Sequence, residues 1–345
     1  MVYAIITDIH FGVHIGQQSF IQYQREYFKH FWQMSDSNQV GGIIFCGDFF
    51  HTRKALDVEA LYLSEELWWK PLSERKHLQC YHIIGNHDTY YKNTNETNSI
   101  RIFASKLDNV TLIENKPLQV ANMLFIPWIN TENLECIVQT LDTSNANIVF
   151  GHFELSLNNE PYYKNQLDVS LLERFKLTIS GHVHNPFEKT FNNGNTFKYI
   201  GSPYESSWNE YGVEDRGFYL LDGFDLKLIK NTNPLHFIRN IGDESIFNLP
   251  QYASLRVLIP SDYDPLKREM EVSKLSKLPL RSIKFIIEEV SNNSTYNIVN
   301  SHLTKNNLNA IVEEYINNLK CAVDKKTLLE KFFELEKESR DNVGI

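Results

Sequence analysis

The sequence contains no long hydrophobic run and only four cysteines. No apolar stretch approaches the ~18 residues that a membrane-spanning helix needs. The apolar pattern at the start of the chain is interrupted by Asp8, which argues against a signal peptide. These absences predict a cytoplasmic protein without a membrane partner. The cysteines show no CxxC spacing, so we expect buried, reduced thiols rather than a disulfide framework or a structural zinc site.

An excess of positive charge is also missing. Lys and Arg number 34 against 43 Asp and Glu, which gives a formal net charge of −9. An acidic chain has no overall field that would attract nucleic acid or another polyanion. Any nucleic-acid binding must therefore come from local basic patches or from a partner. The densest basic stretch is Lys267 and Arg268, followed by Lys274 and Lys277.

Five short apolar runs each end in Gly or Thr and are then followed by side chains that bind metals. Runs rich in Ile, Val and Phe are typical of buried strands. The ends of such strands meet at one edge of a sheet, where ligands bind in open α/β folds. We therefore expect the side chains after the strands to converge. They are Asp8 and His10, then Asp48, then Asn86, His87 and Asp88, then His152, and finally His182 and His184.

The ligand types in these clusters indicate the kind of ion. Carboxylate, carboxamide and imidazole groups suit manganese, iron or zinc, and no cysteine stands in a ligand position. About seven ligands would crowd one ion, whereas two ions that share a carboxylate fit the number better. Two metals ~3.5–4 Å apart form the clamp used for in-line displacement at phosphorus. The remaining histidines lack this context and are expected to be structural or surface residues: His14, His30, His77, His82, His236 and His302.

Strands and amphipathic helices alternate as far as about residue 230, which predicts a layered α/β domain. One helix is expected to begin after Ser19 as N-cap, a second to run from Asp57 through Trp68, and a third to span residues 100–107. Later strands at residues 198–200 and 218–222 suggest a second sheet.

The last third of the chain shows a different pattern. Residues 231–234 have turn chemistry and predict a linker. Strands at residues 255–259 and 283–288 around a helix capped by Asp264 predict a small β-α-β module. After a polar break at residues 291–295, two helices are expected, with apolar stripes at residues 308–319 and 328–335. Both apolar stripes must be buried, either against this chain or against a partner.

The ordered motifs Asp-x-His, Gly-Asp, Gly-Asn-His-Asp, Gly-His and Gly-His-x-His resemble those of calcineurin-like metallophosphoesterases. Within that superfamily the chain is similar to SbcD-type DNA-repair nucleases, and particularly to the recombination endonuclease subunits of T-even phages. The resemblance rests on the first two thirds of the chain and, weakly, on residues 312–316. Its supporting segments are residues 8–12, 47–54, 85–88, 127–128, 199–203 and 215–218.

The resemblance implies roles for individual residues. Asp48 would bridge two metals, His87 would be the catalytic histidine held by Asp88, and His51 would position the scissile phosphate. Manganese would be the activating ion, with magnesium as an alternative. Arg53 and Lys54 are candidate phosphate contacts, or else a solvated approach to the next helix. The first metal would be held by Asp8, His10, Asp48 and His184, and the second by Asp48, Asn86, His152 and His182.

The resemblance also implies a fold and a domain plan. Residues 1–235 would form a four-layer sandwich of two β-sheets flanked by helices, residues 236–290 a small α/β cap that contacts DNA through Lys267 and Arg268, and residues 291–345 a helix pair. The helix pair would bind an SbcC-type coiled-coil ATPase. Helices near Trp68 and Ile100 would form a homodimer. If the chain is phage-encoded, its location would be the host cytoplasm.

Three functions follow from these observations. The first is a manganese-dependent DNA exonuclease and endonuclease that acts with the ATPase in DNA end processing, recombination and double-strand-break repair. The second is a phosphatase or small-molecule phosphodiesterase. Protein phosphatases of the superfamily carry Asp-Arg-Gly after the second motif, whereas this chain has His51, Thr52 and Arg53. The third is a scaffold with a vestigial site, which the complete ligand set argues against.

Overall fold

The computed structural model describes residues 1–156 and 167–288, together with Lys325 and Lys331. All elements reported below belong to one compact unit, Met1–Glu289. The predicted break at residues 291–295, both C-terminal helices, His302 and Cys321 lie outside the described residues. Among the described helices, none is long and apolar enough to cross a membrane.

The first of two large sheets has the strand order β14-β13-β1-β2-β3-β4. Strands β1 to β4 run parallel to one another. Strand β13 pairs antiparallel with β1, and β14 pairs antiparallel with β13. The strands are β1 (Val2–Ile6), β2 (Gly42–Cys46), β3 (Gln79–Ile83), β4 (Val110–Ile113), β13 (Gly217–Asp222) and β14 (Asp225–Lys230). Strands β1 and β2 are buried over most of their length because apolar layers cover both faces.

The second large sheet has the order β11-β12-β10-β7-β6-β5. Strands β12, β10, β7 and β6 are parallel, and hairpins add β11 and β5 at the two edges. The strands are β5 (Leu118–Val120), β6 (Met123–Phe125), β7 (Ile148–His152), β10 (Leu177–Gly181), β11 (Phe187–Thr190) and β12 (Thr196–Tyr199).

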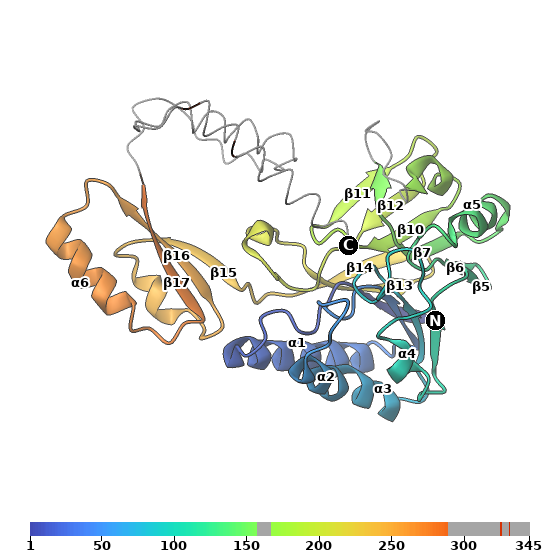
Figure 1. The fold of residues 1–345 in the computed structure, drawn as a ribbon, viewed down its shortest axis with the longest axis horizontal. Helices are drawn as coiled ribbons and strands as arrows, with labels where there is room; N and C mark the ends of the chain where they lie inside the picture. The colour runs from blue at the N-terminus through green and yellow to red at the C-terminus, as the bar shows by residue number, and fades with distance from the viewer. Residues whose placement is uncertain (157–166, 289–324, 326–330, 332–345) are drawn as a thin grey trace. The chain divides into compact units, whose positions relative to one another are not determined.

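The layers confirm the predicted four-layer α/β sandwich. Helices α1 (Gln18–Ser37), α2 (Val58–Ser64) and α3 (Lys70–Glu74) lie on one side of the two sheets, and α5 (Leu134–Thr143) lies on the other (Figure 1). Ile5 and Ile44 of the first sheet share a buried cluster with Phe150 and Ile179 of the second, so apolar side chains fill the space between the sheets. Separate clusters form under α1 to α3 and under α5.

Several predicted boundaries were wrong. Helix α1 begins at Gln18, and no side chain caps it, so Ser19 lies inside the helix. The second predicted helix is confirmed: Asp57 caps α2 by accepting a hydrogen bond from Glu59 N, and a π-helical segment (Glu65–Trp69) continues α2 into α3 without a break. The third helix is only the four residues of α4 (Arg101–Ala104). Strand β13 belongs to the first sheet, because it pairs with β1 through Ala4 and Leu220.

The predicted β-α-β module is confirmed, with an additional strand. Parallel strands β15 (His236–Asn240), β16 (Ser254–Pro260) and β17 (Ser282–Glu288) form a three-stranded sheet, and α6 (Pro265–Leu275) connects the last two. The Asp264 carboxylate caps α6 by accepting from Lys267 N at 2.8 Å. The linker before the module is anchored, because Asn231 Nδ2 donates to Tyr23 Oη at 2.7 Å. Short elements complete the description: β8 (Leu155–Ser156), β9 (Leu167–Asp168), η2 (Val169–Leu172), η3 (Trp208–Glu210) and η4 (Glu244–Asn248).

His82 on β3 is a buried histidine outside the predicted site. Its ring stacks on Phe45 at 4.4 Å between centroids and on Trp69 at 5.6 Å. Neither ring nitrogen has a hydrogen-bond partner among the described residues. Burial lowers the pKa of His82 from 6.5 to about 3. The histidine is therefore a neutral part of the aromatic core.

This burial predicts an acid-dependent loss of stability. Between pH 6.5 and pH 3, His82 is protonated in the unfolded chain but stays neutral in the folded chain. The free energy of unfolding therefore falls as the pH drops. His82→Phe removes this difference and should recover about 2 kcal/mol of stability at pH 5 relative to pH 7.5. Urea denaturation at both pH values measures the change. The exposed His30→Asn is the control, and an equal pH dependence in His82→Phe and the wild type would contradict the prediction.

Candidate metal centre

The predicted ligands come together where the two sheets meet. The spacing argument placed all five clusters at the edge of a single sheet, and this was wrong. Asp8, Asp48 and Asn86 follow β1, β2 and β3 of the first sheet, whereas His152 and His182 belong to the ends of β7 and β10 of the second. His152 Nδ1 lies 2.7 Å from the carbonyl oxygen of Cys46, which ties the two sheets together beside the ligands.

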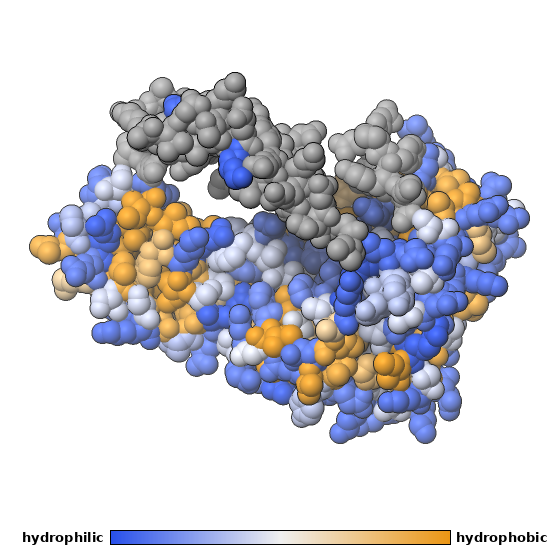
Figure 2. Space-filling view, in the orientation of Figure 1, coloured by the Kyte–Doolittle hydropathy of each residue, from blue (hydrophilic) through white to orange (hydrophobic). Residues whose placement is uncertain are grey.

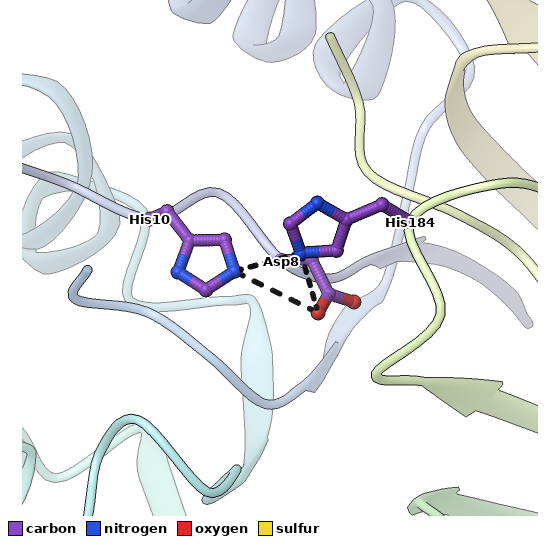
Figure 3. Close-up of side chains that lie close together, drawn as sticks. All are labelled: Asp8, His10 and His184. Carbon is purple, nitrogen blue, oxygen red and sulfur yellow. Dashed lines mark hydrogen bonds and ion pairs between the residues drawn. The ribbon is translucent and has the colours of Figure 1, made fainter. Parts of the chain in front are cut away.

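A first group of ligand atoms comes from Asp8, His10 and His184, which all lie within 4.8 Å of one another. The imidazole Nε2 atoms of His10 and His184 approach to 3.0 Å, and Asp8 Oδ1 lies 4.0 Å from the first and 3.8 Å from the second (Figure 3). Two imidazole nitrogens and one carboxylate oxygen thus face a common point.

A second group comes from Asp48, His152 and His182. His152 Nε2 lies 3.3 Å from Asp48 Oδ2, and Asn86 Oδ1 lies 3.0 Å from His152 Nε2 and 3.1 Å from His182 Nδ1. Asp48 Oδ2 is also 3.7 Å from His10 Nε2 of the first group. Asp48 therefore lies between the two groups.

The backbone at these residues is strained. Asp8, His10, Asp48 and His182 have positive φ angles of 51°, 46°, 58° and 88°. Such conformations cost of order 1–3 kcal/mol each and cluster at functional sites, where the surrounding structure enforces them. These backbone conformations direct the side chains of the loops after the strand ends toward one another. Together with the oxygen and imidazole donors, it fits a site for two divalent cations.

The protonation states suit metal binding. Burial lowers the pKa of His10 and of His182 to about 3, so both are neutral near pH 7 and can offer a lone pair. Burial raises the pKa of Asp8. Burial acts in the same direction on Asp48, but the neighbouring His152 and His10 outweigh it and hold the pKa of Asp48 below its usual range. The site therefore keeps a carboxylate charged in its interior.

His152 behaves differently from the other ligands. Burial alone would lower its pKa, but the Asp48 carboxylate outweighs burial and raises the pKa to about 9. Without a cation nearby, this imidazole is protonated at neutral pH. A metal ion that binds there must displace the proton, so metal binding is coupled to proton release.

Three polar residues that the sequence argument missed orient the ligands. Glu210 Oε1 accepts from His184 Nδ1 at 2.7 Å, which leaves His184 Nε2 to face the site. The Arg216 guanidinium donates to the His184 carbonyl at 2.8 Å, and Thr7 Oγ1 donates to Asp8 Oδ2 at 2.7 Å. Arg216 lies within the segment 215–218 that carries the family resemblance. Glu210 lies in the short η3 turn and has no sequence signal of its own.

Asp88 has different contacts from those expected. Its carboxylate does not hold the His87 ring but accepts backbone hydrogen bonds from Gly85, Asp48, Phe49 and Phe50 at 2.8–3.3 Å. Burial, and then the charge of Asp48, raise the pKa of Asp88 to about 7. Asp88 therefore fixes the loops after β2 and β3 relative to each other.

His87 lies beside the first group of ligands. Its ring centroid is 5.0 Å from that of His10 and 6.0 Å from that of His51, with which it stacks. His87 Nδ1 lies 2.6 Å from the carbonyl oxygen of His51, and His87 N donates to Asp48 Oδ1 at 2.8 Å. His51 is exposed and His87 is partly exposed, as groups that contact a substrate must be.

The predicted phosphate contacts are dispersed. Arg53 donates to the backbone and side-chain oxygens of Thr89 at 3.2 and 3.1 Å, so it holds the loop after Asp88. Lys54 is exposed and follows His51 by three residues in the chain. Lys267 and Arg268 lie on α6 of the three-stranded module, and none of their described contacts involves the ligand groups.

Comparison with known proteins agrees with this geometry. Residues 1–186 match the family described as calcineurin-like phosphoesterase. The chain belongs to this family. As a calcineurin-like phosphoesterase, it is a hydrolase of phosphate esters. It is similar to "Exonuclease subunit 1" of Enterobacteria phage T4, with 26% identity over 336 residues that cover 92% of this chain and 93% of that protein.

Two solved structures of phosphoesterases also resemble the chain. A dimetal phosphatase from Danio rerio is 11% identical, with a TM-score of 0.40, over 64% of this chain and 91% of that chain. The phosphoesterase Yfce from E. coli is 13% identical, with a TM-score of 0.36, over 66% of this chain and 92% of that chain.

The contact of Glu210 with His184 predicts a specific defect in metal binding. Glu210→Gln keeps the side-chain size but removes the charge that orients and polarises His184, so affinity for Mn²⁺ should fall roughly 10- to 100-fold. Calorimetric titration of the metal-free chain with Mn²⁺ measures the loss. Glu214→Gln, an exposed acidic residue nearby, is the matched control. Equal affinities for the two variants would show that Glu210 does not position the ligand.

Proposed function

We propose that this phosphoesterase is the nuclease subunit of a DNA-processing complex, with manganese as its preferred ion and magnesium as an alternative. The observation that carries the proposal is Asp48, buried between two groups of ligands with His87 beside them. Similarity to an exonuclease subunit over 92% of the chain supports a DNA substrate, because it extends beyond the family domain.

In this proposal Asp8, His10, Asp48 and His184 hold one ion, and Asp48, Asn86, His152 and His182 hold the other. Two bound cations would supply charge neutralisation at the phosphodiester and a water of lowered pKa. The protein residues fix the geometry: Glu210 orients His184, Thr7 orients Asp8, and Asp88 fixes the loop that carries Asn86. The short distances between ligand atoms support this assignment.

His87 is proposed as the general acid for the departing sugar oxygen. Its Nδ1 faces the His51 carbonyl, which only accepts, so Nδ1 carries a hydrogen and Nε2 is left to exchange a proton with the substrate. General acid catalysis of this kind contributes typically ~100- to 10,000-fold to the rate. His51, whose ring stacks on His87, would contact the scissile phosphate.

A pair of variants separates catalysis from metal binding. His87→Asn should lose ~100-fold or more of the cleavage of linear DNA, whose departing sugar oxygen needs a proton, while it retains two Mn²⁺ per chain. Asp48→Ala should lose hydrolysis together with both metals, because both groups use this carboxylate. Steady-state kinetics and metal analysis of the same preparations measure both effects. Near-normal activity of His87→Asn, or two ions in Asp48→Ala, would refute the respective role.

The three-stranded module is proposed to help bind DNA. Phosphate contacts normally dominate the affinity of proteins for DNA, and the net charge of −9 makes local patches necessary. Lys267 and Arg268 on α6, and Lys54 just after His51 in the chain, would supply such contacts. Arg53 would act mainly through Thr89, which it already holds. A partner would provide the remaining affinity.

The proposed partners are an SbcC-type coiled-coil ATPase and a second copy of this chain. The ATPase would bind through residues 291–345, which follow the nuclease domain (1–235) and the cap (236–290) in the proposed domain plan. The homodimer is supported by exposed apolar side chains on α2 and α4, where Val58 is 79% and Ile102 61% exposed. Figure 2 shows apolar surface over this region.

The competing function is a phosphatase or small-molecule phosphodiesterase. Purified chain, alone and with an SbcC-type partner, should degrade end-labelled linear DNA with Mn²⁺ and hydrolyse a nitrophenyl phosphate monoester poorly. Circular single-stranded DNA tests for endonuclease activity. Rapid hydrolysis of the monoester without cleavage of any DNA, with or without the partner, would refute the nuclease and favour the phosphatase.

A further inference from the structure

Two adjacent tyrosines lie in the loop that follows the catalytic candidates His87 and Asp88. Tyr90 is 40% and Tyr91 51% exposed, and their rings contact edge to face at 4.7 Å. Lys92 follows and is exposed as well. Tyr90 is three residues from His87, so their Cα atoms lie within roughly 11 Å of each other. Large aromatic surface is thus left in water next to the site where a phosphodiester would be cut.

The base of this loop is held firmly. Thr89 and Asn98 form an antiparallel bridge, Tyr90 N donates to Thr97 O at 2.9 Å, and Ser99 N donates to Asp88 O at 2.9 Å. Arg53 holds Thr89 from the side. These contacts close the base of the loop, while the rings of Tyr90 and Tyr91 remain exposed.

The loop is also fixed to the framework of the metal centre. Asn95 Nδ2 donates to the carbonyl oxygens of Trp128 and Glu114, both at 2.7 Å. The Trp128 ring packs on His182 and His152, with centroids 5.4 and 5.7 Å apart. Because the loop and the ligands share these supports, the backbone that carries the tyrosines is fixed relative to His152 and His182. An aromatic surface held in place in advance loses little entropy when a ligand stacks on it.

We propose that Tyr90, Tyr91 and Lys92 form a stacking platform for a nucleobase of an unpaired DNA strand next to the scissile phosphate. Exposed aromatic rings beside a lysine are the combination that holds single strands, since the rings stack on bases and the cation meets the backbone. The sequence tolerance of stacking suits a nuclease that cuts many sequences. The inference rests on the proposed nuclease function and adds a binding site to it.

The test compares full-length chain carrying Tyr90→Ala and Tyr91→Ala together with the matched Tyr90→Phe and Tyr91→Phe chain. On a single-stranded oligonucleotide with Mn²⁺, the alanine pair should lose roughly 10- to 100-fold in kcat/KM, mainly through KM, while the phenylalanine pair stays near wild type. On an oligonucleotide whose nucleotides near the cut lack bases, wild type and the alanine pair should be equal. Hydrolysis of bis-nitrophenyl phosphate and Mn²⁺ binding should remain unchanged in both.

A second variant tests the lysine. Lys92→Ala should reduce the salt dependence of single-strand binding by about 0.7 in log–log slope, the loss of one phosphate contact. Unchanged kinetics of the alanine pair on the normal oligonucleotide would overturn the platform, as would equal losses on the normal and base-free oligonucleotides. A change of oligomeric state in the alanine pair would also overturn it in favour of a protein contact. If the wild type cleaves neither oligonucleotide, alone or with an SbcC-type partner, the nuclease function itself fails.

Discussion

The site depends on the burial of a carboxylate charge where two β-sheets meet. Asp48 is 2% exposed and Asp8 1% exposed, and neither can remain ionised without compensation. For Asp48 the compensation comes mainly from His152 of the second sheet, whose raised pKa leaves its imidazole protonated at neutral pH. The same carboxylate accepts His87 N, so the catalytic candidate is positioned by the charge that would bind the metals.

The ligand loops stay in strained conformations because other interactions over-determine them. The Asp88 carboxylate accepts hydrogen bonds from four backbone N–H groups of two loops. These hydrogen bonds stabilise the folded loops and so offset the conformational strain of the positive φ angle at Asp48. Gly85 is necessary at this crowded point, because a Cβ there would collide with the Asp48 carboxylate. The strained backbone, the buried Asp88 and the absence of a side chain at Gly85 together place the ligand oxygen and nitrogen atoms of the two groups.

A short segment links the metal centre to the three-stranded module. Glu205 accepts from Leu235 N and His236 N, both at 2.8 Å, at the beginning of β15. Five residues later, Glu210 holds the ligand His184. Trp208 between them packs against the Arg256 guanidinium of β16 at 3.9 Å. The module that is proposed to bind DNA therefore contacts the same turn that orients a metal ligand.

The sequence by itself predicted which side chains come together, because apolar runs typical of buried strands precede Asp8, Asp48, Asn86, His152 and His182. It also determined the β-α-β module, through Asp264 and Pro265 at the start of α6. Tertiary structure alone decided that the strands divide between two sheets, since their local patterns are alike and only pairing distinguishes them. The roles of Glu210 and Asp88 were decided in the same way. A hydrogen bond between residues distant in sequence leaves no periodicity, and neighbouring residues such as His87 and Asp88 can point to different partners.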